Sequence, residues 1–116
     1  MKKPAKTADL RKKQEAEKLL AAIPTSAAIV ALDERGKALS SRDFAKKIDN
    51  WGVEGLSTVV FIIGGADGLD ESVRKKAHLI LGFGTLTWPH KLVRVMLTEQ
   101  IYRAWSISTG HPYHRD

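Results

Sequence analysis

The segment AAIVALDERGKALSSRDFAKKIDNWGVEGLSTVVFII, residues 27–63, decides the fold class. It begins and ends with uninterrupted apolar runs, AAIVAL at residues 27–32 and STVVFII at residues 57–63. Such runs are typical of strands covered on both faces, as in a parallel sheet. Between them, residues 40–51 show the pattern of a capped amphipathic helix. Strand, helix and strand in this order predict an α/β fold: a parallel sheet with flanking helices.

Glycines follow the second predicted strand and interrupt a third. GGADG at residues 64–68 leads into a helix predicted over residues 71–78, and the strand predicted over residues 79–86 contains Gly82 and Gly84. The loop matches neither GxGxxG nor a P-loop. Glycine weakens a strand unless something packs against the bare backbone. Two glycine-bearing strand ends in one small sheet therefore predict a single ligand pocket between them.

Residues 91–108 form the longest predicted helix. Pro89 fits its first turn, Thr87 or Trp88 is the candidate cap, and Gly110 supplies the stop signal. Its apolar residues cover more than the single stripe of a surface helix. We therefore expect the sheet on one face and a partner subunit on the other. These apolar residues are Leu92, Val93, Val95, Met96, Leu97, Ile101, Tyr102, Ala104, Trp105 and Ile107.

Polar chemistry gathers at the end of this helix and in the tail HPYHRD, residues 111–116. Glu99 and Arg103 stand at i,i+4, which is an ordinary ion-pair spacing on a helix surface as well as a possible catalytic pair. The tail joins two imidazoles, a phenol and a guanidinium, which can bind phosphate, stack on bases or move protons. A plain solvated end is the alternative. The spacing of its His and Asp residues does not favour a zinc site.

Length, composition and charge limit the classes to which the protein can belong. Its 116 residues predict one domain, residues 1–116, and no apolar run is long enough to span a membrane. Residues 1–8 are expected to be flexible, with a helix capped by Asp9 up to residue 22. The absence of cysteine excludes disulfides and agrees with a cytoplasmic location. The net charge of +6 favours a polyanionic partner such as RNA.

Three motifs stand out together: IGGADGL at residues 63–69, LTWPHKLVRVMLTEQIYRAWSI at residues 86–107 and GHPYHRD at residues 110–116. They resemble those of the ribosomal RNA large subunit methyltransferase H family, in the SPOUT class. The resemblance covers roughly residues 9–116. It implies a trefoil-knotted α/β fold and a homodimer, for which the apolar helix over residues 89–107 is the expected interface. No metal is expected, because of the residue spacing in the tail. The resemblance also implies S-adenosylmethionine-dependent methylation at N3 of a pseudouridine in 23S rRNA of the assembled ribosome.

There are two sets of candidate site residues: the first is carried over residue by residue from the resemblance, and the second is chosen for the chemistry of the reaction that the resemblance implies. Those for the cofactor S-adenosylmethionine are Leu32, Gly64, Phe83, Gly84, Thr85, Leu86, Thr87 and Trp88. Those for substrate orientation and proton handling are Glu99, Arg103, His114 and Arg115, with His114 as candidate base and Arg115 as candidate clamp for phosphate or carbonyl. Core packing is the alternative role for Phe83 and Leu86.

One departure from the family pattern concerns the N-terminus. Family members usually carry a strand, a helix and a strand ahead of the segment that matches residues 7–22. A truncated chain, a misassigned start and a minimal version all remain open. The alternative function is therefore a non-catalytic, basic dimer that binds RNA or cofactor.

Overall fold

A computed structural model of the chain describes residues 4–64, 69–84 and 88–115. The elements run in the order α1 (Pro4–Ala22), β1 (Ala27–Lys37), α2 (Ser41–Val53), β2 (Thr58–Ile63), α3 (Glu71–Lys76), β3 (Leu79–Leu81) and α4 (His90–Thr109). The strands form one parallel sheet in the order β2-β1-β3. This confirms the predicted α/β class and the strand–helix–strand unit at its centre.

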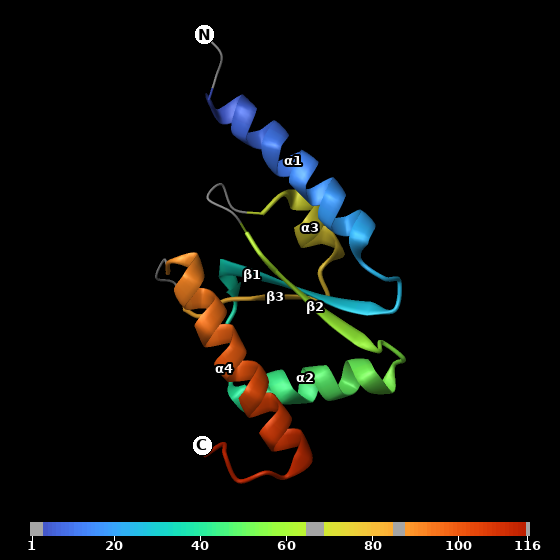
Figure 1. Cartoon of the computed structure of the whole chain (residues 1–116), viewed down its shortest axis with the longest axis vertical. Coiled ribbons are helices and arrows are strands. Elements are labelled where there is room, and N and C mark those ends of the chain that lie inside the picture. The colour runs from blue at the N-terminus through green and yellow to red at the C-terminus, as the bar shows by residue number, and fades with distance from the viewer. Residues whose placement is uncertain (1–3, 65–68, 85–87, 116) are drawn as a thin grey trace.

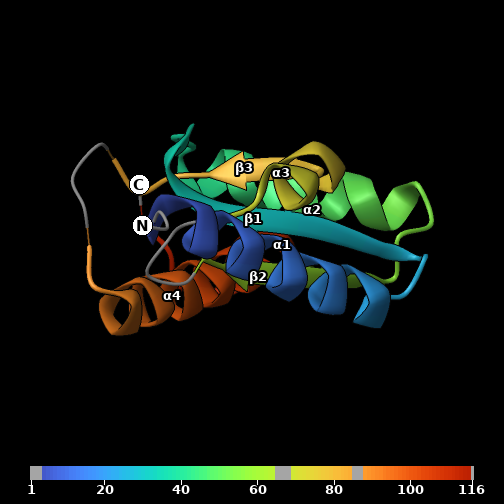
Figure 2. The same cartoon turned by 90° about the horizontal axis from the view of Figure 1, so that it is seen from above.

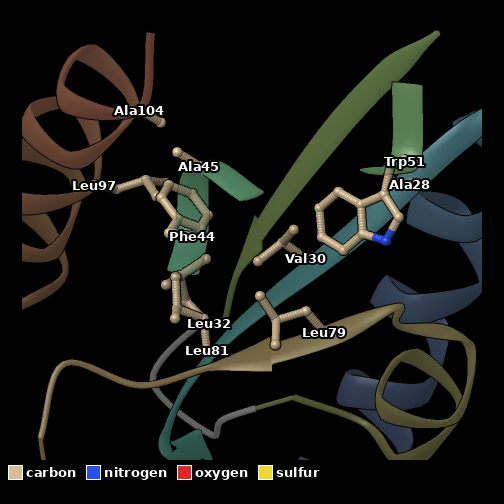
Figure 3. Close-up of a cluster of buried hydrophobic side chains, with 10 residues drawn as sticks. All are labelled: Ala28, Val30, Leu32, Phe44, Ala45, Trp51, Leu79, Leu81, Leu97 and Ala104. Atoms are coloured by element: carbon tan, nitrogen blue, oxygen red, sulfur yellow. The ribbon is translucent and has the colours of Figure 1, made fainter. Parts of the chain in front are cut away.

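The sheet is covered on both faces, as its continuous apolar strands require. Helices α1 and α3 lie on one face, and α2 and α4 lie on the other (Figures 1 and 2). Alternate residues of β1 face opposite sides of the sheet. Ile29 and Ala31 pack with Ala16 and Val73, whereas Val30 packs with Phe44. Figure 3 shows the larger cluster, which joins the sheet to Trp51 of α2 and, through Leu97 and Ala104, to α4.

Helix α4 has two different faces, as its excess of apolar residues predicted. Its inner face packs mainly against α2, with only its buried side chains reaching the sheet cluster, so the expected contact with the sheet alone was too simple. The Ser41 hydroxyl donates to Gln100 Oε1 at 2.5 Å, and the Ser108 hydroxyl donates to the Asp49 carboxylate at 3.0 Å. Its outer face leaves five large side chains exposed in the single chain: Leu92, Val95, Ile101, Tyr102 and Trp105.

Strand β1 passes the end of β3 twice. Leu81 is paired first with Leu32 and then with Lys37, with residues 33–36 leaving the regular ladder between the two pairings. The Gly82 N–H donates to the Lys37 carbonyl at 3.0 Å. A Cβ at Gly36 would lie 2.6 Å from the Leu81 carbonyl carbon, and one at Gly82 would lie 2.8 Å from the Asp33 carbonyl oxygen. Only glycines allow this backbone crossing.

The crossing explains why two strand predictions differ from the structure. Strand β1 extends to Lys37, beyond the predicted residues 27–32, because its end returns to pair with Leu81. Strand β3 ends at Leu81, whereas the sequence predicted residues 79–86. Gly82 already belongs to the crossing, where the chain bonds to Lys37 and leaves the ladder.

The helix boundaries also differ at three places. Helix α1 begins at Pro4, which is tolerated in a first turn, so Asp9 lies inside the helix and its prediction as a cap was wrong. The expected flexibility of residues 1–8 stays a prediction. Helix α3 ends at Lys76 and not at residue 78. His78 instead joins the sheet: its N–H donates to the Ile29 carbonyl at 2.7 Å, and its Nδ1 accepts from the Ile29 N–H at 2.9 Å.

The start of α4 has no side-chain cap. Pro89 occupies the capping position just before the first helical residue, so it precedes the first turn, and Trp88 is not the cap. The other candidate, Thr87, lies outside the described residues. At the far end, Gly110 adopts a left-handed conformation with φ of 76°, which confirms the predicted stop.

The crossing generates a stability prediction. Gly82→Ala places a methyl group against the Asp33 and Gly36 carbonyl oxygens, which are backbone atoms and cannot rotate away. We expect the free energy of unfolding to fall by about 1–3 kcal/mol, the usual range for overpacking. The measurement is equilibrium urea unfolding followed by circular dichroism.

Gly52→Ala is the matched control, because nothing lies within 4 Å of a Cβ added at this helical position. It should leave stability unchanged or raise it by at most about 1 kcal/mol. Equal unfolding midpoints for the two variants would contradict the close crossing.

Candidate active site

The carboxyl ends of the three strands meet at one edge of the sheet. The register aligns Leu32 of β1 with Ile63 of β2 and with Leu81 of β3. Gly64 and Gly82, which follow these partners, therefore leave the sheet at the same level. Ligands of open parallel sheets bind at this carboxyl edge. The structure thus brings Leu32 close to the chain segment of Gly64, as the predicted pocket requires.

The segment after β3 supplies the remaining predicted cofactor residues. Phe83 is half-buried and packs against the larger core cluster, and Gly84 is exposed with φ of 97°. The Trp88 indole Nε1 donates to the Phe83 carbonyl at 3.2 Å, which ties the two described ends of this segment together. Thr85, Leu86 and Thr87 lie outside the described residues. Packing against the core, the alternative role considered for Phe83, is therefore observed.

Asp33 is a charged residue at the same edge that the sequence prediction omitted. Its side chain is only 10% exposed and forms an ion pair with Arg74 of α3, whose side chain is 18% exposed. Its Oδ1 also accepts the Arg35 backbone N–H at 2.8 Å. Burial alone would raise the pKa of Asp33. The Arg35 N–H and the guanidinium groups of Arg74 and Arg35 oppose this effect and hold the pKa below its ordinary value.

The predicted catalytic residues gather where the tail folds back on α4. Arg103 is placed between Glu99, to which its Nε donates, and His114, whose Nδ1 lies 3.2 Å from Arg103 Nη1. Because a guanidinium can only donate, Nδ1 of His114 is the acceptor in this contact. The ion pair considered for Glu99 and Arg103 is therefore present, and it forms part of a larger polar cluster. Arg115 is exposed.

Tyr113 completes this cluster, although the prediction of site residues did not include it. Its hydroxyl donates to Glu99 Oε2 at 2.9 Å, and the Arg103 guanidinium carbon lies 5.1 Å from its ring centroid. The hydrogen bond to the Glu99 carboxylate raises the pKa of the phenol. Its place between His111 and His114 in the tail motif was the available signal. Aromatic rings extend the cluster. The ring centroid of Tyr102 lies 4.5 Å from that of Tyr113 and 5.5 Å from that of Trp105.

The two sets of predicted residues lie apart within one chain. Arg103 stands fourteen residues after Pro89, which amounts to roughly 20 Å along a helix rising 1.5 Å per residue. Figure 1 shows the tail turning back at the end of α4 remote from the start of the helix. In one chain, therefore, the polar cluster does not face the strand-end segments that the resemblance assigns to the cofactor.

Two negative observations concern the described residues alone. They contain no group of three or more His, Asp or Glu side chains placed to hold a metal ion. Within the same part of the chain, none of the helices has both the length and the apolar character needed to cross a bilayer.

The pKa of Asp33 generates a pH prediction. A depressed pKa in the folded state contributes stability above the pKa of the unfolded state, and this contribution is lost as pH falls through the folded value. Asp33→Asn should therefore lower the free energy of unfolding at neutral pH by about 1–3 kcal/mol, the scale of a charged hydrogen bond. The deficit should shrink as the wild type is acidified. Urea unfolding of both proteins across acid and neutral pH measures it.

Glu54→Gln is the control, because Glu54 is an exposed carboxylate just after α2. It should leave stability at neutral pH nearly unchanged. A deficit in Asp33→Asn that stays constant down to acid pH would contradict the charged pair.

Comparison with known proteins identifies the family. A family model described as "Predicted SPOUT methyltransferase" matches residues 1–114. The chain is 57% identical over 104 residues to the ribosomal RNA large subunit methyltransferase H of Rhodospirillum centenum, covering 90% of this chain and 68% of that protein. It is 55% identical over 111 residues to the protein of the same name from Xanthobacter autotrophicus, covering 96% of this chain and 69% of the relative. The chain therefore belongs to the ribosomal RNA large subunit methyltransferase H family of SPOUT methyltransferases.

Proposed function

We propose that this protein uses S-adenosylmethionine to methylate N3 of a pseudouridine in 23S rRNA of the assembled ribosome. The observation that carries the proposal is the family match over residues 1–114, a range that includes both the strand-end segments and most of the tail cluster. The relatives at 55–57% identity are ribosomal RNA large subunit methyltransferases by name. A positively charged chain suits such a substrate, and the activity implies a cytoplasmic location.

The residues at the carboxyl edge of the sheet fit the proposed cofactor. Gly84 has open space where a side chain would stand and a φ that favours glycine, so the backbone there is accessible to a ligand. Phe83, which precedes Gly84, offers half-buried apolar surface, and Leu32 is a nearly buried apolar residue at the same edge of the sheet. With the backbone groups of Gly64 as hydrogen-bonding partners, they would meet the needs of an adenosyl group. Leu32, Gly64 and residues 83–88 would hold the cofactor. When bound, S-adenosylmethionine supplies an activated methyl group.

The polar cluster would orient the nucleotide and ease the loss of its N3 proton. Glu99 and His114 hold the Arg103 guanidinium in place, and a fixed cation stabilises negative charge that develops on the base. His114 can act as a base through Nδ1 only after this nitrogen exchanges its contact with Arg103 for the substrate. Arg115 is exposed and available to clamp a phosphate or a carbonyl.

A homodimer would bring the two sets of residues together. The tail cluster lies far from the strand-end segments of its own chain, so we propose that it serves those of a partner subunit. The exposed face of α4 offers the apolar surface for such an interface. The proposal includes a trefoil knot, which rests on the family match.

The dimer generates a prediction. The wild type should show twice the 12.8 kDa chain mass in light scattering at micromolar concentration. Val95→Asp, at a position 64% exposed on the outer face of α4, should dissociate it because the charge would be buried without a partner. Val53→Asp, at an 87% exposed position of α2, is the control and should remain dimeric. A monomeric wild type would refute the interface.

The proposed division between cofactor binding and methyl transfer generates a second prediction. Deleting residues 111–116 should leave the affinity for S-adenosylhomocysteine within about twofold of its original value, because all of the proposed cofactor contacts come from Leu32, Gly64 and residues 83–88. Methyl transfer should fall by orders of magnitude, since a misaligned acceptor loses the proximity on which the reaction depends. Labelled S-adenosylmethionine and ribosomes from a strain lacking the modification provide the assay.

Point variants refine this test. His114→Ala and Arg115→Ala should each reproduce part of the loss, whereas Lys46→Ala, which removes one exposed charge from α2, should not. Full activity of the deleted protein would show the tail to be an ordinary solvated end. Cofactor and ribosome binding without any methyl transfer by the wild type would favour the alternative, a non-catalytic dimer.

A further inference from the structure

The loop that leaves β2 at Gly64 is held at both of its described ends. On one side, Ile63 is fixed by its ladder with Leu32. On the other side, Leu69 leads into α3, where the Asp70 carboxylate caps the helix by accepting a hydrogen bond from the Ser72 N–H at 3.0 Å. The separation of Gly64 from Leu69, the two described residues that flank this loop, therefore depends on where α3 stands relative to β1.

Few contacts hold α3 in that position. The helix has six residues, fewer than an isolated helix needs to be stable, and Val73 is its one buried residue. Val73 packs with Ile29, Ala31 and Ile62, and these apolar contacts allow sliding and rotation. Just after the helix, His78 is hydrogen-bonded to Ile29. Within the helix itself, the directed contact to β1 is the ion pair between Arg74 and Asp33, which joins residues 41 positions apart in the sequence.

Asp33 lies beside both the carboxyl edge of the sheet and the backbone crossing. It follows Leu32 at the carboxyl edge, and its carbonyl oxygen lies 2.8 Å from the place that a Cβ of Gly82 would occupy at the crossing. Both oxygens of its carboxylate accept hydrogen bonds, Oδ1 from Arg35 and Oδ2 from Arg74, and the side chain is nearly buried. This arrangement suits a group that holds another element in place. It leaves little room for direct contact with a ligand.

We propose that Asp33 and Arg74 are positioning residues that fix α3, and through it the Gly64 segment, in the geometry that binds the cofactor. This inference rests on the proposed function, because Gly64 belongs to the proposed cofactor site. The ion pair acts through the backbone: it sets the distance between the end of β2 and the start of α3. Arg35 also contacts the Asp33 carboxylate, at 3.5 Å, but it belongs to the same strand, is 74% exposed and ties nothing to α3.

The difference between the two arginines provides the experiment. Calorimetry with S-adenosylhomocysteine compares wild type with Arg74→Met, Arg74→Lys and Arg35→Met, each at a temperature where circular dichroism shows it to be fully folded. Arg74→Met should raise the Kd at least tenfold. Arg74→Lys, which keeps the charge, should recover most of that loss, and Arg35→Met should remain within twofold of wild type. A purely structural role would not give conservative rescue at constant folding.

Amide exchange without ligand tests the mechanism separately. In Arg74→Met, the amides of residues 72–76 should exchange at least tenfold faster than in wild type, while those of β1 stay unchanged. A folded Arg74→Met with wild-type Kd overturns the inference, as does equal weakening by Arg35→Met. If Arg74→Met does not fold, Arg74→Gln, which keeps an N–H but no charge, is measured in its place under the same criteria.

The calorimetry and the amide-exchange measurement together distinguish failure of this inference from failure of the proposed function. A wild type that does not bind S-adenosylhomocysteine refutes the proposed cofactor, and with it the role of the ion pair in binding. Unchanged exchange of α3 in Arg74→Met, with normal binding by wild type, refutes only the positioning role.

Discussion

The backbone crossing of β1 and β3 is the constraint on which the rest of the structure depends. Because Gly36 and Gly82 lack side chains, residues 33–36 can lie against the chain that leaves Leu81. This contact fixes three things at once: the end of the central strand, the start of the segment at residues 83–88, and the position of Asp33. A loosened crossing would disturb each of them without removing any side chain from the core.

The placement of charge follows from the same arrangement. A nearly buried carboxylate needs a partner, and the chain supplies Arg74 from α3 on the opposite face of the sheet from α2 and α4. The second polar cluster lies at the remote end of α4, where the tail adds Tyr113 and His114 to Glu99 and Arg103. One molecule thus carries two polar groups of residues, one nearly buried beside the strand ends and one partly exposed on α4 and the tail.

Local sequence patterns predicted what depends on local contacts. The apolar runs of β1 and β2, the helix between them and the stop at Gly110 were all read correctly because periodicity and caps act over a few residues. The glycines at the strand ends were interpreted as a ligand pocket, whereas the bare backbone of Gly82 packs against residues 33–36 at the crossing. The extension of β1 to Lys37, the bond between His78 and Ile29, and the ion pair of Asp33 with Arg74 join distant segments, so no local pattern could predict them. The site residues came from the family resemblance, and the separation of their two sets became visible only in three dimensions.

The way in which the tail is attached has a consequence for how the molecule meets a large substrate. After the left-handed turn at Gly110, the tail is held by the His111 N–H to the Ser106 carbonyl at 2.8 Å and by exposed polar and ring contacts. Contacts of this kind open locally at a small fraction of the free energy of global unfolding. Residues 111–115 can therefore exchange their intramolecular partners for those of a nucleic acid while the crossing and the sheet stay closed. The part of the chain nearest to the proposed chemistry is thus also the part that can reorganise most readily.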